Sequence, residues 1–425
     1  MNQQFRRLYA SSATSNLADG IGRTALPLLA ASYTHNAVLV SGLITCTYLP
    51  WLLFALPSGA LIDRLDRRHA MAAANVLRAA CTGVLALLIV SHEASIAVLY
   101  AVAFLLGLAE TVYDSASRAL LPQLVGAAEL DRANSLLTVE ETLGQTFLGA
   151  PIGSVLFATA AALPVLINAV GFAGAALLLL ALRGAFRPPR TGASTTLRQE
   201  IGEGVRWLNG HSLLRGLTLI STVTASVSSM TSGILVLYVI EELRLPPADF
   251  GLVLLVGGLG SILGGLGTPL AARRFGRGRT LTIGCALGAI GVAAMAFTRN
   301  GYVGALFFGI DGAGVMVWNV LTMSLRQALI PQQLFGRVQG AYRTLVFGGI
   351  ALGALAGGAL GHVIGIRPVF LIAGALMFVS ALCLGILCRR HRDVLAEPEG
   401  ELPHDGHGLL GALPPEQVTH AVEGV

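Results

Sequence analysis

Ionisable side chains stand inside segments of this sequence that are otherwise apolar. Asp19 and Arg23 lie four residues apart in one such segment, and Asp311 stands alone in another. Burying an ionised group among apolar residues is costly, so groups kept there serve packing or chemistry. A carboxylate without a partner in such surroundings is readily protonated, as proton coupling requires. Asp19 and Arg23 are one helical turn apart, close enough to pair with each other.

Two further segments carry a denser set of charges. Glu110, Asp114 and Arg118 follow at steps of four, which places them on one stripe of a helix. Glu140 and Glu141 are adjacent, and adjacent side chains on a helix point about 100° apart, so we expect only one to face the interior. Asp114 and Glu141 fall at similar depth in their segments, where they can form an ion-paired cluster with Arg118.

These groups divide by expected role. The proton-coupling candidates are Glu110 first, then Asp19 and Asp311, with Asp114 and Glu141 behind them. The charge-pair candidates are Arg23, Arg118 and Glu140. For Arg118 with Asp114 or a neighbouring glutamate, a salt bridge that only holds helices together remains an equally good interpretation.

The composition indicates which elements position these residues. Of the 425 residues, 54% are hydrophobic and only 12% are charged, which leaves too little polar surface for a soluble domain. A bilayer core about 30 Å thick needs roughly 20 apolar residues per helix. The sequence predicts twelve such spans, at 8–33, 38–62, 70–90, 96–122, 133–158, 162–183, 214–241, 249–272, 279–298, 302–328, 338–363 and 366–388. Alternation with period two is absent, which argues against a barrel.

The basic residues predict the orientation of these spans. All of them are arginine, and the predicted outer loops hold only Arg244, Arg299 and Arg367. Arginine-rich loops stay in the cytoplasm, so we expect a multi-pass protein of the cytoplasmic membrane with both termini inside. The net charge of +5 is therefore explained by topology and does not indicate nucleic acid.

The spans fall into two halves. We expect a six-helix bundle at 1–190, a cytoplasmic loop with an amphipathic helix at 191–212, a second bundle at 213–390 and a disordered tail at 391–425. The halves are similar: RALLPQLV (118–125) is echoed by RQALIPQQL (326–334) at corresponding turns. Two parallel six-helix repeats with a site between them are typical of one large class of secondary transporters.

The second and third spans are joined by GALIDRLDRRH (59–69). This loop resembles the signature loop of the major facilitator superfamily, G-x-L-a-D-R-x-G-R-R, and the match rests on Gly59, Leu61, Asp63, Arg64, Arg67 and Arg68. Asp66 replaces the second glycine of that pattern, which puts the tightness of the turn in question. In the second half, Arg273 stands where the acid belongs, so only the basic part of the motif persists, in Arg274, Gly276 and Arg277. The resemblance covers about residues 5–390 and implies the major facilitator fold, with the loop as a gate whose Asp63 meets the inner start of the eleventh span.

The fourth-to-fifth-span region reads LLPQLVGAAELDRANSLL (120–137). This region resembles the branch of that superfamily holding siderophore exporters and macrolide efflux pumps. GAPIGS (149–154) in the fifth span partly matches the exporter motif G-P-x-x-G-G, with the proline displaced by one position. Gly149, Pro151 and Gly153 are expected to let the helix bend and approach the other half. Asn16, Trp318 and Asn319 are candidate cavity residues, and the hydroxyl-rich segment 221–233 suggests a polar cavity wall.

These observations favour a proton-coupled exporter of a small amphipathic molecule, such as a drug or siderophore, that works by alternating access. A proton-linked importer of a nutrient and a membrane sensor or scaffold that transports nothing are the alternatives. We expect a monomer in the bilayer that binds a small molecule and protons and uses no cofactor. The chain has no lysine, so a phosphate-binding GxxxxGK[ST] loop is impossible. No catalytic or metal-ligating set stands out, so no enzyme is predicted.

Overall fold

The structure is a computed structural model that describes residues 3–62, 65–126, 129–182, 184, 186 and 197–396. Its secondary structure in these residues is entirely helical. The first half contains α1 (Gln3–Tyr33), α2 (Ala37–Ile62), α3 (Arg67–Val90), α4 (Ile96–Leu124), α5 (Leu130–Thr142), η2 (Leu143–Gly149), α6 (Ala150–Thr159) and α7 (Ala162–Leu180). The second half contains α9 (Ser212–Ser232), α10 (Leu235–Leu237), η3 (Tyr238–Glu242), η4 (Pro247–Asp249), α11 (Phe250–Phe275), α12 (Arg277–Met295), α13 (Gly301–Leu329), α14 (Gln332–Ile364) and α15 (Ile366–Arg390).

The helices agree with the predicted spans. Ten of the described helices are long and apolar enough to cross a membrane by length and composition. The other two predicted spans are also helical, but α1 carries several polar residues and the fifth span is divided among α5, η2 and α6. The protein is thus a multi-pass membrane protein of the helical class, and the count of twelve depends on these two.

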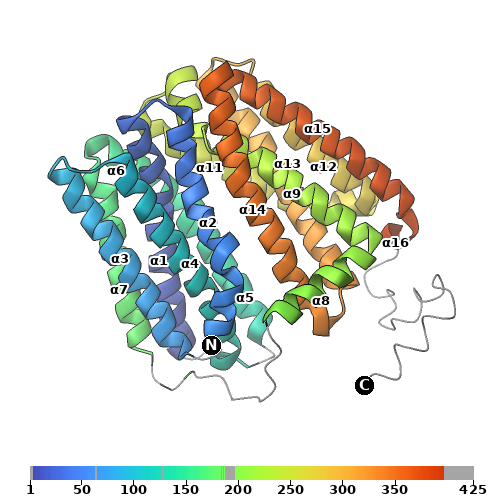
Figure 1. The fold of residues 1–425 in the computed structure, drawn as a ribbon, viewed down its shortest axis with the longest axis horizontal. Coiled ribbons are helices and arrows are strands. Elements are labelled where there is room, and N and C mark those ends of the chain that lie inside the picture. The colour runs from blue at the N-terminus through green and yellow to red at the C-terminus, as the bar shows by residue number, and fades with distance from the viewer. Residues whose placement is uncertain are drawn as a thin grey trace.

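The two bundles lie side by side, with α1–α7 in one and α9–α15 in the other (Figure 1). The predicted amphipathic segment between them forms α8 (Leu197–Gly210). Residues 392–396 form the short helix α16 (Arg392–Ala396), and its Leu395 is buried. The expectation of a disordered tail from 391 is therefore wrong for these residues, because Leu395 joins the apolar core of the second half. Residues 397–425 lie outside the described part.

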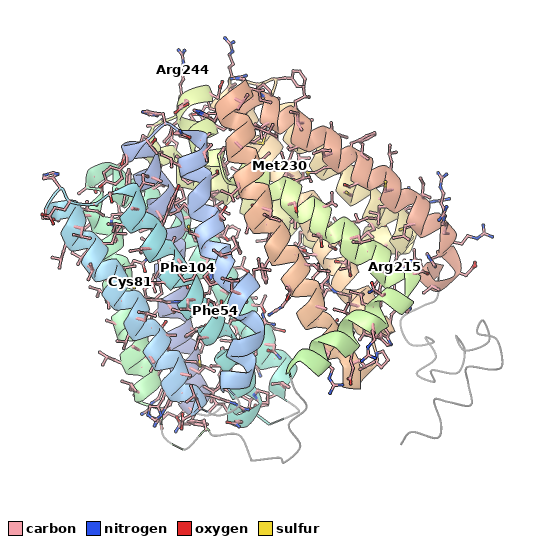
Figure 2. The ribbon with its side chains drawn as sticks, in the orientation of Figure 1. Phe54, Cys81, Phe104, Arg215, Met230 and Arg244 are labelled. Carbon is pink, nitrogen blue, oxygen red and sulfur yellow. The ribbon has the colours of Figure 1, made fainter. Side chains whose placement is uncertain are left out.

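Helix ends are set by local chemistry. Asn300 caps α13 by accepting hydrogen bonds from the backbone N–H groups of Tyr302 and Val303. Gly365 separates α14 from α15 with a φ of 90°, a conformation that favours glycine. Arg244 and Arg215 lie toward opposite ends of the second half (Figure 2). We call the end at which α1 begins the inner end and the opposite end the outer end.

Polar contacts join the halves toward the outer end. Ser154 of α6 donates to the carbonyl of Ala248 at 2.8 Å, and His35 contacts Glu241 at 2.8 Å. Gly251 of α11 approaches α6 so closely that a Cβ there would lie 2.3 Å from the carbonyl oxygen of Ala150. At the inner end, α14 begins against α8, where Arg337 forms an ion pair with Glu203. Among the described residues, the shortest polar contacts between the two halves therefore lie toward the outer end.

Candidate functional site

A cavity of about 730 Å³ lies between the two halves. Both bundles line it, with α1, α2, α4 and η2 on one side and α9, α11, α12 and α13 on the other. Six of the predicted candidates line the cavity, three from the first half and three from the second: Asp19, Arg23, Glu110, Asp311, Trp318 and Asn319. The sequence therefore located the cavity from its charged residues.

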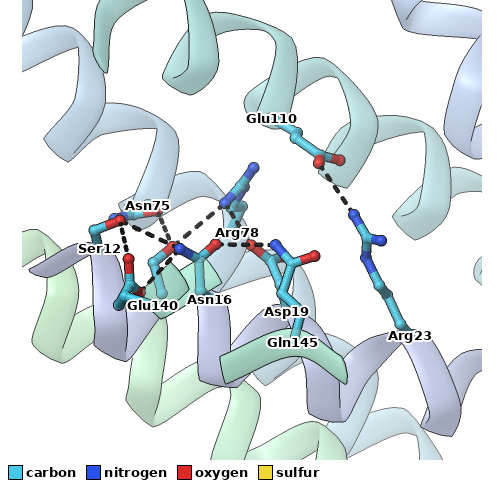
Figure 3. A network of polar contacts seen from close by, with 10 residues as sticks. Ser12, Asn16, Asp19, Arg23, Asn75, Arg78, Glu110, Glu140 and Gln145 are labelled. Atoms are coloured by element: carbon cyan, nitrogen blue, oxygen red, sulfur yellow. Dashed lines mark hydrogen bonds and ion pairs between the residues drawn. The ribbon is translucent and has the colours of Figure 1, made fainter. Parts of the chain in front are cut away.

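Both acids of the first-half cavity wall face an arginine. The Arg23 guanidinium lies 3.6 Å from Glu110, and the buried Arg78 lies 3.3 Å from Asp19 (Figure 3). Asp19 and Arg23 lie within electrostatic range of each other, as expected. Their direct ion pairs nevertheless reach across to other helices instead of along α1. Arg78 of α3 was missed as a partner, although its place inside an apolar segment is the signal that identifies it.

Glu140 belongs to a second polar network behind this wall. Its oxygens accept hydrogen bonds from Ser12 Oγ at 3.1 Å and Asn16 Nδ2 at 3.0 Å. Asn16 Oδ1 in turn accepts from Gln145 Nε2 at 2.9 Å. Asn16 is thus engaged in this network and is not among the residues that line the cavity, whereas Gln145 lines it. Sequence reasoning missed Gln145, although it follows Glu141 by one helical turn.

Asp311 differs from the acids of the first half. It lines the cavity from α13, and its Oδ1 is buried without a hydrogen-bond partner. Gly288 of α12 makes room for it, since a Cβ at that glycine would lie 3.3 Å from Oδ1. Asp311 is therefore the cavity carboxylate of the described residues without an ion-pair partner.

A smaller charged cluster lies toward the inner end. Asp114 contacts Arg118 of its own helix at 3.1 Å and Arg343 of α14 at 3.7 Å, so it joins the two halves. This confirms Asp114 among the possible partners of Arg118. Glu141 lies within electrostatic range of Asp114 and Arg118, while Glu140 packs away from them, as expected for adjacent helical residues.

The hydroxyl-rich segment forms one wall of the cavity, as predicted. Ser221, Thr224, Ser228, Ser229 and Ser232 of α9 all line it. Thr224 donates to the backbone carbonyl of Ile220 at 2.8 Å, so part of this hydroxyl capacity is used within the helix. Apolar and aromatic residues complete the lining, among them Phe250, Phe308 and Trp318, which gives the cavity an amphipathic surface.

The exporter-like motif lies where the fifth span changes from η2, a π-helix, to α6. Gly149 and Gly153 face α1 of the same half: a Cβ at Gly149 would lie 2.6 Å from the Cα of Gly20. Pro151 instead faces the other half, since a Cβ at Gly251 would lie 2.7 Å from its Cα. The expected approach to the second half is thus made by Pro151, and the two glycines serve packing within the first.

The described part of the signature loop binds to its own half. Asp66 caps α3 by accepting from the backbone N–H groups of Arg68 and His69, and it also accepts from Phe186 N at 3.2 Å. Burial raises the pKa of Asp66, but these backbone donors, with His69 and Arg68 nearby, leave that pKa below its ordinary value. Asp66 thus holds the turn as an N-cap where the second half uses Gly276 with a φ of 82°.

The arginines of this loop bind backbone carbonyls of neighbouring segments. Arg67 donates to the carbonyl of Ala119 in α4 at 2.7 Å, and Arg68 donates to the carbonyl of Leu182. Asp63 and Arg64 lie outside the described residues, as does the side-chain environment of Gly59. The gating role of these three residues stays a prediction.

A multi-pass helical protein with two similar bundles around one central, partly charged cavity is a membrane transporter rather than an enzyme. Residues 8–354 match the family described as Major Facilitator Superfamily. The chain belongs to this superfamily.

Relatives with named activities extend along most of the chain. It is 27% identical over 397 residues to the multidrug efflux pump Tap of Mycolicibacterium fortuitum, a match that covers 91% of this chain and 97% of that protein. It is 22% identical over 394 residues to macrolide efflux protein A of Streptococcus pyogenes, covering 91% and 95%. These relatives agree with the branch suggested by the fourth-to-fifth-span region.

Solved structures match the fold at low identity. The nucleoside transporter NupG has a TM-score of 0.77 at 13% identity, with 91% of this chain and 99% of that chain covered. A bacterial homologue of the iron transporter ferroportin, in its inward-facing state, has a TM-score of 0.73 at 16% identity, with 91% and 99% covered. The major facilitator fold is therefore established for this chain.

Proposed function

We propose that this protein exports small amphipathic molecules across the cytoplasmic membrane in exchange for protons. The observation that carries this proposal is the unpaired carboxylate of Asp311 in the wall of a large cavity between the two halves. Such a group is costly to keep ionised in an apolar surrounding, so it binds a proton readily and can release one when the cavity changes its access. The names of the relatives support export and a drug-like substrate.

The sequence placed Glu110 first among the proton carriers, and the structure moves our choice to Asp311. Glu110 and Asp19 each lie beside an arginine, so their charges are compensated. In our proposal they keep the first half of the cavity folded and polar. Asp114 and Glu141, at the inner end, serve the closing of that end rather than the carriage of protons.

The proposed cycle is alternating access. In our proposal, the contacts between the halves toward the outer end mark the state in which substrate enters from the inner side. A rocking motion of the two bundles would then open the outer side, where a proton displaces the substrate. The arginine distribution supports placing both termini in the cytoplasm. The signature loop, with Asp63, would meet the start of α14 when the inner side closes.

Everted membrane vesicles test this function directly. Vesicles containing the protein are given an inward-acid pH gradient, and uptake of ethidium, erythromycin and tetracycline is measured before and after collapse of the gradient with a protonophore. We expect gradient-dependent uptake of at least one of them that vesicles without the protein lack. Uptake only in right-side-out vesicles would favour the importer, and no gradient-dependent movement of any probe in either orientation would favour the sensor or scaffold.

A further inference from the structure

A row of hydrogen bonds connects a carboxylate behind the cavity wall with a side chain in that wall. Glu140 is 5% exposed and does not line the cavity. Asn16 links it to Gln145, which does. Figure 3 shows Glu140, Asn16 and Gln145 one after another in space, with Ser12 beside Glu140. The cavity surface at Gln145 is thus connected to a titratable group that a ligand does not touch.

The carboxylate of Glu140 determines which atom of each amide in this row donates a hydrogen bond and which accepts one. An ionised carboxylate only accepts hydrogen bonds, so Asn16 presents its Nδ2 to Glu140 and its Oδ1 to Gln145. Gln145 therefore presents Nε2 to Asn16. Its carbonyl oxygen points away from Asn16 (Figure 3) and offers the cavity a hydrogen-bond acceptor.

The helices that carry the row are held at a fixed separation. A Cβ at Gly20 of α1 would lie 2.4 Å from the carbonyl oxygen of Gln145, and one at Gly144 would lie 3.2 Å from the backbone nitrogen of Leu17. Backbones in such close contact leave little room for α1 and η2 to separate. A half-turn of a planar amide, in contrast, exchanges its oxygen and nitrogen without changing its shape.

We propose that the protonation state of Glu140 decides, through Asn16, whether Gln145 offers the cavity an acceptor or a donor. When Glu140 takes up one proton, its O–H donates to Asn16 Oδ1, which turns toward it. Asn16 Nδ2 then donates to Gln145 Oε1, and Gln145 Nε2 faces the cavity. The turn of Asn16 also gives up the hydrogen bond from its Nδ2 to Ser12 Oγ at 3.2 Å, and the only covalent bond that forms is the O–H of Glu140. Gln145 is thus a positioning and specificity residue for a substrate that carries an N–H or O–H donor.

The groups around Glu140 do not hold its charge in an ion pair, so a change in its protonation acts on the row of hydrogen bonds. In the described part of the chain, its hydrogen-bond partners are Ser12 and Asn16 of α1. The other titratable groups within electrostatic range are Glu141 on its own helix and Tyr113 of α4. The Tyr113 ring faces Arg78 of α3, whose guanidinium carbon lies 5.3 Å from its centroid. No arginine among the described residues forms an ion pair with Glu140, so a proton changes its hydrogen bonding without breaking a salt bridge.

This inference deepens the proposed function, because it states how a proton would alter substrate affinity, but its test needs no transport. Protein labelled with ¹⁵N-glutamine is placed in lipid nanodiscs, and the side-chain amide signal of Gln145 is assigned by its loss in Gln145→Leu. Hydrogen exchange of that amide is measured as a protection factor from pH 5 to pH 9. We expect protection at high pH, where Nε2 is bonded to Asn16, and about a fivefold loss at low pH, the effect of one net hydrogen bond.

Two glutamate variants decide the outcome. In Glu140→Gln, which has a neutral side chain with its own donor, we expect low protection at every pH. Glu141→Gln is the matched control, since it neutralises the adjacent carboxylate outside the row and should keep the wild-type pH dependence. A Gln145 amide whose protection does not change with pH in the wild type, or that responds to Glu141→Gln as it does to Glu140→Gln, overturns the proposal. Failure of proton-driven transport with this switch intact would instead overturn the proposed function.

Discussion

The two walls of the cavity treat their acidic residues differently. In the first half, Asp19 and Glu110 each lie beside an arginine from another helix. In the second half, Asp311 lines the same cavity and has no ion-pair partner among the described residues. Paired charges hold helices together and resist a change of protonation, whereas an unpaired carboxylate changes its charge easily. We therefore propose that the ion pairs of the first wall stabilise the fold and that Asp311 in the second wall couples transport to protons.

Removing the unpaired acid is expected to have the largest effect. Asp311→Asn should reduce pH-gradient-driven uptake in everted vesicles to the level of vesicles without the protein, because no cavity proton site remains in the second half. Its thermal unfolding temperature should not fall, since the variant removes a buried charge that lacks a donor. Asp311→Glu, which keeps the carboxylate, should retain part of the uptake.

The same uptake assay with Glu110→Gln tests whether an acid of the first wall is also needed for the dependence on the pH gradient. This variant leaves Arg23 without its partner and should lower uptake without abolishing its dependence on the gradient. If Glu110→Gln abolishes that dependence and Asp311→Asn does not, the assignment of the two walls is reversed.

Breaking the ion pair between Arg78 and Asp19 tests whether the pairs of the first wall stabilise the fold. Arg78 is 2% exposed, and Arg78→Ala leaves the carboxylate of Asp19 without its ion-pair partner, with Arg23 as the remaining positive charge nearby. Loss of one partner of a buried pair costs roughly 3–5 kcal/mol, which should appear as a large fall in unfolding temperature in detergent. The double variant Arg78→Met with Asp19→Leu removes both charges and should recover most of it. Equal loss in the single and double variants would show that packing of Arg78, and not its charge, is responsible.

The halves also differ in their inner loops, where Asp66 stands in one and Gly276 in the other. Asp66→Ala should destabilise the protein by about 1 kcal/mol at pH 7, the usual value of an N-cap. Because the pKa of Asp66 is lowered in the folded state, its contribution is present above the ordinary aspartate pKa and is lost as the pH falls through the lower folded value. The deficit of Asp66→Ala relative to wild type should therefore shrink below about pH 4. Unfolding at a series of pH values measures this, and a deficit that persists in acid would contradict it.

The contact between the halves at the inner end should have the smallest effect. Arg343 and Asp114 are both partly exposed, 29% and 31%, and such pairs contribute about 0.2–1 kcal/mol. Arg343→Ala should shift the inward-facing population by less than about fivefold, measured by spin-label distances between Thr159 and Tyr302 at the outer end. Arg118→Ala, which breaks the pair within α4, is the control and should leave those distances unchanged.

The sequence predicted the fold and the cavity more fully than the contacts within it. Apolar length and arginine placement were enough to locate the spans, because a bilayer imposes the same physical demand on each one. The cavity acids were found for the same reason, since a charge in a span has few uses. Spacing along a helix nevertheless did not predict the direct ion-pair partner of Arg23, because partners on other helices depend on how the bundle packs. The role of Gln145 depends on such packing as well.

The inner ends of α3, α4 and α7 are tied together by one loop. Asp66 caps α3 and holds Phe186, which follows α7, while Arg67 binds the carbonyl of Ala119 in α4 and Arg68 binds that of Leu182 after α7. A force applied to this loop is therefore shared by three helices at once. Because α4 and α7 also supply lining residues of the cavity, the polar contacts of this loop link the inner rim of the first half to its cavity wall.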